Sequence, residues 1–244
     1  MLSALAALER AWPGAVELPE TWPECERLLP HILALEQSAA VGDDAAVVLV
    51  GLLNQACKYL SHAGGGLRAG EAAEEVYEAS RRLLGPEHPH TLASASNLAE
   101  TRRDLGDAEG ALRLHQEVYE ASRRLLGPEH PHTLTSANNL AETRRDLGDV
   151  EGALRLHQEV YEARRRLLGP EHPHTLTSAN NLADTRRALG DAEGALRLHQ
   201  EVYEAFRRLL GPEHPHTLTS ANNLAETRRA LAEPFSTSDA SRPG

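Results

Sequence analysis

Histidine is the residue whose type and spacing most suggest chemistry in this sequence. The string GPEHPHTL begins at Gly85, Gly127, Gly169 and Gly211 and supplies eight of the 13 histidines. Imidazole and carboxylate groups bind zinc or nickel, but a loop with two histidines lacks the three or four ligands of a defined site. We expect adventitious metal binding at most, with no resident metal or cofactor. The alternative role is mechanical: the first histidine of each loop lies at a helix entrance, and the following proline lies in the first turn.

Catalytic sites are singular arrangements of residues, whereas this sequence is periodic. The histidine and serine candidates for a base or nucleophile are copied with the repeat. Lys58 is the only lysine, so the Gly-Lys-Ser/Thr element of a nucleotide-binding phosphate loop is missing. We predict that the chain is not an enzyme.

Composition argues against several classes of partner. Acidic residues outnumber basic ones, 36 to 25, and the formal charge of -11 repels phosphate backbones, so general nucleic-acid binding is not expected. The longest apolar run, residues 45–53, is too short for a membrane span, and residues 1–12 carry no basic leader. Two cysteines, Cys25 and Cys57, do not make a disulfide framework. We expect a cytoplasmic protein that does not enter membranes.

A repeat of 42 residues determines the architecture. Successive full repeats differ at only 4 positions, and EEVYEASRRLLG at 74–85 matches the repeat in register upstream of them. The predicted segments are an N-terminal helical capping segment at 1–42, a diverged repeat at 43–84, full repeats at 85–126, 127–168 and 169–210, a C-terminal half repeat at 211–232, and a disordered tail at 233–244.

Each repeat is predicted to form a helical hairpin that buries its apolar face against its neighbours. The first helix of the second full repeat starts at Pro131 and ends near Gly148, and the second starts at Asp149 and stops at Gly169. No strand pattern appears, so we predict an all-helical solenoid. The expected apolar positions are Leu134, Ala137, Leu140, Ala141 and Leu147 in the first helix, and Ala153, Leu156, Val160, Tyr161 and Leu167 in the second.

These residues resemble the tetratricopeptide repeat (TPR), in the 42-residue form found in kinesin light chains and many bacterial multidomain proteins. The match covers about residues 43–232 and rests on NNLA at 138–141, LGD at 147–149 and GALRLHQEVYE at 152–162. Three positions depart from the family pattern, because Ala137, Arg144 and His157 stand where it has larger or apolar side chains. The resemblance implies an all-α fold, a right-handed superhelical solenoid of antiparallel helix hairpins.

A shorter resemblance lies upstream, where TWPECERLLPHILAL at 21–35 is similar to the segment that joins bacterial NB-ARC/STAND signalling ATPases to their TPR regions. It implies that this chain is the sensor portion of such an ATPase. The apolar residues of the segment would form helices that cap the first hairpin: Leu28, Leu29, Ile32, Leu33 and Leu35.

The few differences between repeats are concentrated on one helical face. Four variable columns lie in the first helix at offsets of 0, 3, 7 and 11 residues, which place them within an arc of about 80° opposite the apolar side. In the TPR family this stripe lines the concave groove. The columns are Ala93/Thr135/Thr177/Thr219, Ser96/Asn138/Asn180/Asn222, Glu100/Glu142/Asp184/Glu226 and Asp104/Asp146/Ala188/Ala230.

An invariant asparagine column lies beside the stripe, and its carboxamides could bind the backbone of an extended peptide, as the family commonly does. The alternative is hydrogen bonding between neighbouring helices. A flanking arginine column could pair with acidic ligand side chains, although Glu142 and Arg145 are also spaced for pairing within one helix. The predicted peptide-binding groove comprises Asn97, Asn138, Asn139, Asn180, Asn181, Asn222, Asn223, Glu100, Glu142, Asp184, Glu226, Arg103, Arg145, Arg187, Arg229, Thr135, Thr177 and Thr219.

Two further columns are expected to be structural. His115, His157 and His199 are predicted to pack between repeats as half-buried rings. The column Arg102, Arg144, Arg186 and Arg228 falls on the apolar side, where an unpaired charge would be costly. We expect these side chains to lie along the seam and to pair with Glu117, Glu159 and Glu201 of adjacent second helices.

The function predicted from the sequence is that of a non-catalytic scaffold that binds a protein or an extended peptide in its groove. The alternative is a structural or self-assembly module. In that case the half repeat at 211–232, which lacks its second helix, would join another copy.

Overall fold

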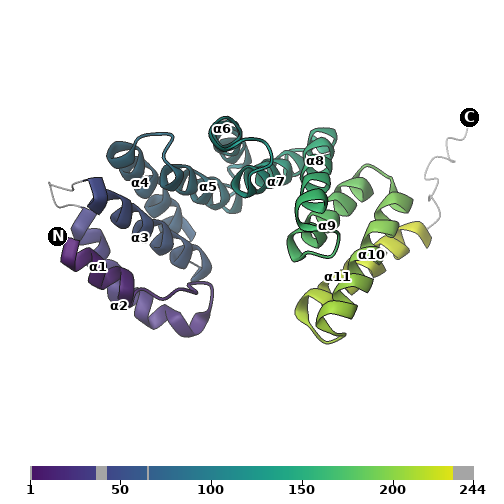
Figure 1. Cartoon of the computed structure of the whole chain (residues 1–244), viewed down its shortest axis with the longest axis horizontal. Coiled ribbons are helices and arrows are strands. Elements are labelled where there is room, and N and C mark those ends of the chain that lie inside the picture. The colour runs from purple at the N-terminus through teal and green to yellow at the C-terminus, as the bar shows by residue number, and fades with distance from the viewer. Residues whose placement is uncertain (1, 37–42, 65, 233–244) are drawn as a thin grey trace, which may run out of the picture. The chain divides into compact units, whose positions relative to one another are not determined.

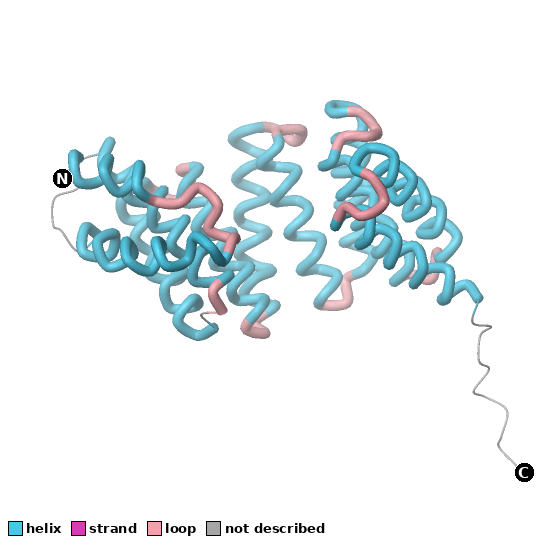
Figure 2. Tube along the Cα trace, turned by 90° about the horizontal axis from the view of Figure 1, so that it is seen from below, coloured by secondary structure: helices cyan, strands magenta, loops and turns pink. Residues whose placement is uncertain are grey.

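The computed structural model describes residues 2–36, 43–64 and 66–232, and every regular element among them is helical (Figures 1 and 2). This confirms the predicted all-α class, while the predicted tail at 233–244 lies outside the described residues. The elements are α1 (Leu2–Ala11), the 3-10 turn η1 (Pro19–Thr21), α2 (Trp22–Glu36), α3 (Asp43–His62), α4 (Gly66–Leu84), α5 (Pro89–Asp104), α6 (Ala108–Leu126), α7 (Pro131–Asp146), α8 (Val150–Leu168), α9 (Pro173–Ala188), α10 (Ala192–Leu210) and α11 (Pro215–Ala232).

Two compact units make up the chain, an N-terminal unit of residues 1–136 and a C-terminal unit of residues 137–244, and the division falls within α7. In the N-terminal unit α1 and α2 both pack on α3, and α3 to α6 then pack consecutively, with α3 also touching α5. In the C-terminal unit α8 to α11 pack consecutively, as Figure 1 shows. Within each unit, these helices thus pack on helices that are close to them along the chain.

The second helix of each full repeat begins and ends as the sequence predicts. Asp149 is the N-cap of α8, and its carboxylate accepts a hydrogen bond from the Gly152 backbone N–H at 2.9 Å. At the other end Gly169 has φ 91°, a left-handed conformation that favours glycine. Asp107 and Asp191 cap α6 and α10 in the same way.

The paired loop histidines have the structural role at helix entrances that was the alternative to metal binding. His88 is the N-cap of α5, with Pro89 in the first turn, and its Nδ1 accepts a hydrogen bond from the His90 backbone N–H at 3.2 Å. The same bond recurs from His132 to His130, from His174 to His172 and from His216 to His214. The prediction of a histidine at each helix entrance is thus confirmed.

The N-terminal capping segment belongs to the core of its unit. Leu28 and Ile32 of α2 are buried in the same cluster as Leu49 and Leu53 of α3, and Leu29 and Leu35 are partly buried against it. Leu33 departs from the prediction, because it is 41% exposed. The segment therefore covers one face of α3 with most of the residues expected to do so.

The helical pattern wrongly predicted that leucines near the helix ends are buried. Leu147 is 40% exposed, because α7 ends at Asp146 and Leu147 lies in the turn that follows. Leu167 is 50% exposed in the last turn of α8, whereas Leu134, Ala137, Leu140 and Ala141 are buried as expected. A periodic pattern continues past the point where packing ends, so it overestimates burial there.

The histidines of the second helices are buried more deeply than predicted. His115, His157 and His199 are at most 1% exposed, where half-buried rings were expected. His157 Nδ1 lies 2.8 Å from the Thr185 hydroxyl, which donates to the Asn181 carbonyl at 2.9 Å, so the ring nitrogen must be the donor to Thr185. His199 and Thr227 repeat the arrangement at 2.8 Å. These bonds join the second helix of one repeat to the first helix of the next.

Burial keeps these rings neutral. Desolvation, followed by the charge of Arg145, lowers the pKa of His157 from 6.5 to about 4. Desolvation, followed by the charge of Arg103, does the same for His115. Burial also lowers the pKa of His199, although Asp184 and Glu226 act in the opposite direction. The Glu142 carboxylate lies 3.7 Å from His157 Nε2, but it is paired with Arg145 at 2.8 Å.

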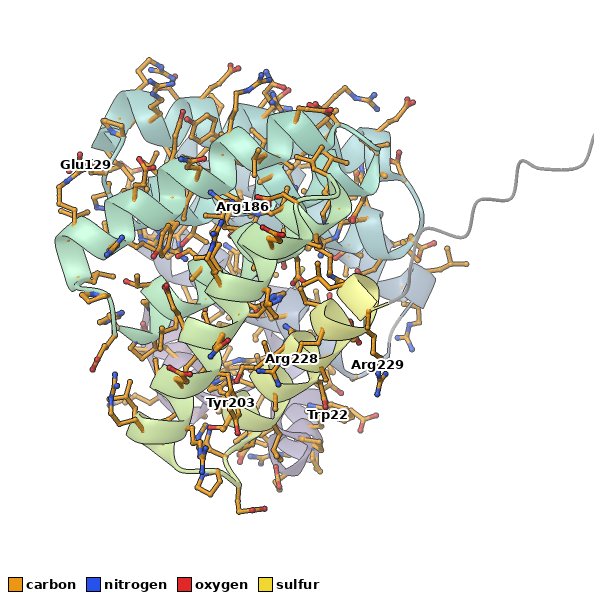
Figure 3. The ribbon with its side chains drawn as sticks, turned by 90° about the vertical axis from the view of Figure 1, so that its right-hand side faces the viewer. Trp22, Glu129, Arg186, Tyr203, Arg228 and Arg229 are labelled. Atoms are coloured by element: carbon orange, nitrogen blue, oxygen red, sulfur yellow. The ribbon has the colours of Figure 1, made fainter. Side chains whose placement is uncertain are left out.

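The arginines predicted to lie along the apolar seam have different partners from those expected. Arg102 pairs with Glu74 at 2.7 Å, while Arg144 and Arg186 lie 3.7 Å from the N-cap aspartates Asp149 and Asp191. The predicted pairing with Glu117, Glu159 and Glu201 is therefore wrong. The carbonyl of each arginine also accepts from the backbone N–H of that aspartate, which brings the two residues together across the turn. Arg228, labelled in Figure 3, is exposed on α11.

Acidification should destabilise the fold because of the buried histidines. Because the pKa of these rings is depressed in the folded protein, they bind protons below pH 6.5 in the unfolded chain but stay neutral down to about pH 4 in the folded chain. Stability present above pH 6.5 is thus lost as pH falls through this window, by about 2 kcal/mol per ring at pH 5. Urea unfolding at pH 7 and pH 5 measures the loss, and His157→Gln should reduce the pH slope. An equal free energy of unfolding at both pH values would contradict the prediction.

A second prediction concerns the aspartate caps. Asp191→Ala removes the acceptor for the Gly194 N–H and should lower the free energy of unfolding by about 1 kcal/mol. Asp191→Asn keeps a capping oxygen but removes the charge near Arg186, and should lose much less. Urea titration of both variants tests the cap, and equal losses would show that the ion pair matters instead.

Candidate functional site

The variable stripe lies outside the core, as the sequence predicts. None of its sixteen residues is buried. Glu142 and Asp184 are half-buried, as are Ser96, Asn138 and Asn180, and the others are exposed: Ala93, Thr135, Thr177, Thr219, Asn222, Glu100, Glu226, Asp104, Asp146, Ala188 and Ala230. This face of the first helices is available to a ligand.

The asparagines beside the stripe hydrogen-bond to one another between repeats. Asn181 Nδ2 donates to Asn138 Oδ1 at 2.9 Å, and Asn223 Nδ2 donates to Asn180 Oδ1 at 2.8 Å. In the N-terminal unit Asn97 Nδ2 donates to Asn54 Oδ1 at 3.2 Å. Each bond uses one oxygen and one N–H and is of the interhelix kind that was the alternative to peptide binding.

Sequence reasoning missed Asn54 as a member of this ladder. It lies on α3, is 7% exposed, and also donates to the His90 carbonyl at 3.1 Å. The signal was present in the sequence, because Asn54 is in register with Ser96, Asn138 and Asn180. The diverged repeat therefore keeps the acceptor that its neighbour needs.

Two of the arginines that flank the stripe are paired within their own helices. Arg145 Nη2 lies 2.8 Å from Glu142, and Arg187 Nη2 lies 3.2 Å from Asp184. Glu226 of α11 lies 3.7 Å from the same Arg187 atom. Arg103 is half-buried and Arg229 is exposed near the end of α11 (Figure 3). Part of the charge pattern is therefore ordinary helix-surface pairing.

Two of these arginines line an open pocket of about 440 Å³ in the C-terminal unit. We call it the Arg145–Arg187 pocket, and it is lined by Arg145 of α7, Asp184, Arg187 and Ala188 of α9, and Asn223 of α11. Three successive first helices thus contribute to one hollow. The structure brings together four of the predicted site residues here, whereas the threonine column does not line the pocket.

One hydrogen-bond donor at the pocket has no acceptor in the described part of the chain. Arg187 Nε is buried and has no hydrogen-bond partner among the described residues, so one donor of this guanidinium is unused. Ala188 stands where two earlier repeats have Asp104 and Asp146, which removes an acidic group from the rim. A carboxylate entering the pocket would meet two guanidinium groups that are already held by their neighbours.

No group of three or more His, Cys, Asp or Glu side chains in residues 2–36, 43–64 and 66–232 is arranged to hold a metal ion. No helix in this part of the chain is both long enough and apolar enough to cross a bilayer.

Several solved structures have a similar fold. A candidate kinesin light chain from Podosopora anserina with nearly identical TPR-like repeats is 29% identical, with a TM-score of 0.66 over 74% of this chain and 85% of that one. BtubC from P. vanneervenii is 19% identical, with a TM-score of 0.67 over 95% and 84% of the two chains. A STAND protein with a TPR sensor from Pyrococcus horikoshii is 14% identical, with a TM-score of 0.66.

The likeness to the last two proteins shows the fold alone. The alignment with the STAND protein covers 95% of this chain but only 34% of that one. No curated protein sequence matches the chain. The tetratricopeptide repeat family model matches residues 50–123, 91–163, 133–204 and 177–234, which together span most of the sequence. The chain therefore belongs to the tetratricopeptide repeat family.

Proposed function

We propose that this chain is a non-catalytic scaffold that binds an acidic extended peptide of a protein partner on the first-helix face. TPR repeats generally mediate protein–protein interaction. The observation that carries the finer proposal is the Arg145–Arg187 pocket, where an unused Arg187 N–H faces no acceptor. An acidic side chain would displace the weaker Glu226 contact at 3.7 Å and receive charge-assisted hydrogen bonds.

The asparagine ladder supports the same role in two ways. Its interhelix bonds fix the spacing of the first helices, and hence of Arg145 and Arg187. Asn223 also lines the pocket, and its second N–H and its oxygen are not used in the bond to Asn180. We propose that these free groups bind the peptide backbone beside the acidic side chain.

The wider setting is also a proposal. The similarity of residues 21–35 to STAND linkers and the shared fold of a STAND protein support a role as the sensor region of a signalling ATPase. Cys25 and Cys57 are both free and buried, which supports a reducing, cytoplasmic location.

Peptide selection tests the binding proposal. Short random peptides displayed on phage should yield acidic sequences when selected on the folded chain, and Arg187→Gln should weaken their binding about tenfold or more. Arg197→Gln on α10 is the control, because Arg197 is exposed and does not line the pocket. Fluorescence polarisation measures both affinities. Selected peptides without acidic residues, or equal losses in the two variants, would contradict the proposal.

Self-assembly is the second candidate, and it rests on one observation. Leu218 of α11 is 49% exposed, whereas its counterparts Leu134 and Leu176 are 6% and 4% exposed. A second copy that packed on α11 would cover this leucine, as residues of α10 pack with Leu176 in the C-terminal unit.

Light scattering after size exclusion, over a range of concentrations, tests self-assembly. If α11 is an interface, the mass should rise with concentration and Leu218→Glu should abolish the rise. Leu231→Glu, which changes a leucine that is 41% exposed near the end of α11, is the control. A monomer at every concentration would reject this candidate and leave the scaffold proposal intact.

A further inference from the structure

A second pocket, in the N-terminal unit, differs in chemistry from the Arg145–Arg187 pocket. We call it the N-terminal pocket. It has a volume of about 440 Å³ and lies among the end of α1 and the segment that follows it, α3 and α5. Its walls include Trp12 and Pro13 of the capping segment, Val48 of α3 and Asn97 of α5. The capping segment therefore contributes one wall of this pocket.

Small residues keep this pocket open. Gly51 and Ala93 line it, and they occupy the column in which the later repeats have Thr135, Thr177 and Thr219. A side chain at position 51 would have room, because a Cβ there would meet only His90 Cε1, at 3.7 Å. Larger residues in this column would fill the space that the diverged repeat leaves empty.

The interior of the pocket is largely apolar. Val47 and Val48 are half-buried, and Leu52 is 4% exposed. Trp12 is 8% exposed, and its indole N–H is buried with no acceptor among the described residues. An unpaired buried donor is unfavourable, so a ligand oxygen admitted beside the indole would relieve a cost that the free protein carries.

The charges at the pocket are opposite in sign and unpaired. Lys58, the only lysine, stands in the column where the other repeats have Glu100, Glu142, Asp184 and Glu226. Glu9 of α1 lines the same pocket. Both side chains are exposed, and in the part of the chain that the structure describes neither has an ion-pair partner. The repeat has thus lost its usual acid and gained a cation beside a separate carboxylate.

We propose that the N-terminal pocket binds a small zwitterion with an apolar body, namely a free apolar amino acid or a dipeptide. Lys58 pairs with the ligand carboxylate and Glu9 with its ammonium group, while Trp12, Val48 and Leu52 enclose the side chain. A zwitterion matches this pair of charges, whereas an anion would be repelled by Glu9 and a cation by Lys58. Gln55 and Asn97 offer amide donors and acceptors to a peptide bond.

Calorimetry with the full chain and the dipeptide Leu-Phe tests the proposal. Leu-Phe with free termini should bind, and either N-acetylation or C-terminal amidation should weaken its binding about tenfold. Lys58→Gln should weaken binding of free Leu-Phe to the same extent but leave the amidated form unaffected. Glu9→Gln should show the matching pattern with the acetylated form.

Pocket-filling variants locate the binding. Gly51→Leu should abolish it, whereas Thr135→Leu, in the same column but outside the pocket, should not. Ala93→Leu, at an exposed position in the pocket, is a second filling variant in case Gly51→Leu fails to fold by circular dichroism. Absence of binding by Leu-Phe and by free phenylalanine overturns the proposal, as does binding that survives both filling variants. Equal binding of the doubly blocked dipeptide also overturns it, because the pocket would then take internal peptide segments.

Discussion

The structure depends on one constraint: a single hairpin cannot by itself bury the apolar and polar side chains of its seam, the face that contacts the next hairpin. The residues at each seam must therefore be complementary to a copy of themselves displaced by one repeat. Two kinds of hydrogen bond meet this requirement: the asparagine pairs between first helices, and the histidine–threonine pairs between a second helix and the next first helix. Because these groups are buried or half-buried, their bonds fix the register between neighbouring hairpins.

This constraint accounts for much of the invariance between repeats, and four of the six columns that vary lie in the first helix. Seam residues such as His157 and Thr185 have partners in the next repeat, so a change in one would leave the other unpaired. The stripe is less constrained: Thr177 hydrogen-bonds within its own helix, although Asn138 and Asn180 accept bonds from the next repeat. Changes in the stripe, such as Asp146 to Ala188, alter the charge of the exposed face without affecting the fold. Recognition can thus be adjusted on a scaffold that stays the same.

Helices, caps and most of the core could be predicted from the sequence, because the 42-residue period and the turn residues specify them locally. Asp149 and Gly169 specify the start and the end of a helix through their local conformation, without long-range contacts. The interaction partners of individual side chains were harder to predict from the sequence. Arg144 was expected to meet a glutamate of an adjacent second helix, but the backbone turn brings Asp149 to 3.7 Å from its guanidinium. The depth of His157 also depends on packing by neighbouring helices, which periodicity alone does not measure.

The central claim is that the asparagines hold neighbouring helices together while Arg187 is the group that recognises an acidic ligand. Side-chain NMR of the labelled protein during titration with an acidic peptide tests it most directly. The account predicts that the Arg187 Nε–Hε signal moves as its unused donor gains an acceptor, while the Asn181 side-chain amide, bonded to Asn138, keeps its shifts. A moving Asn181 amide with a stationary Arg187 signal would contradict the account.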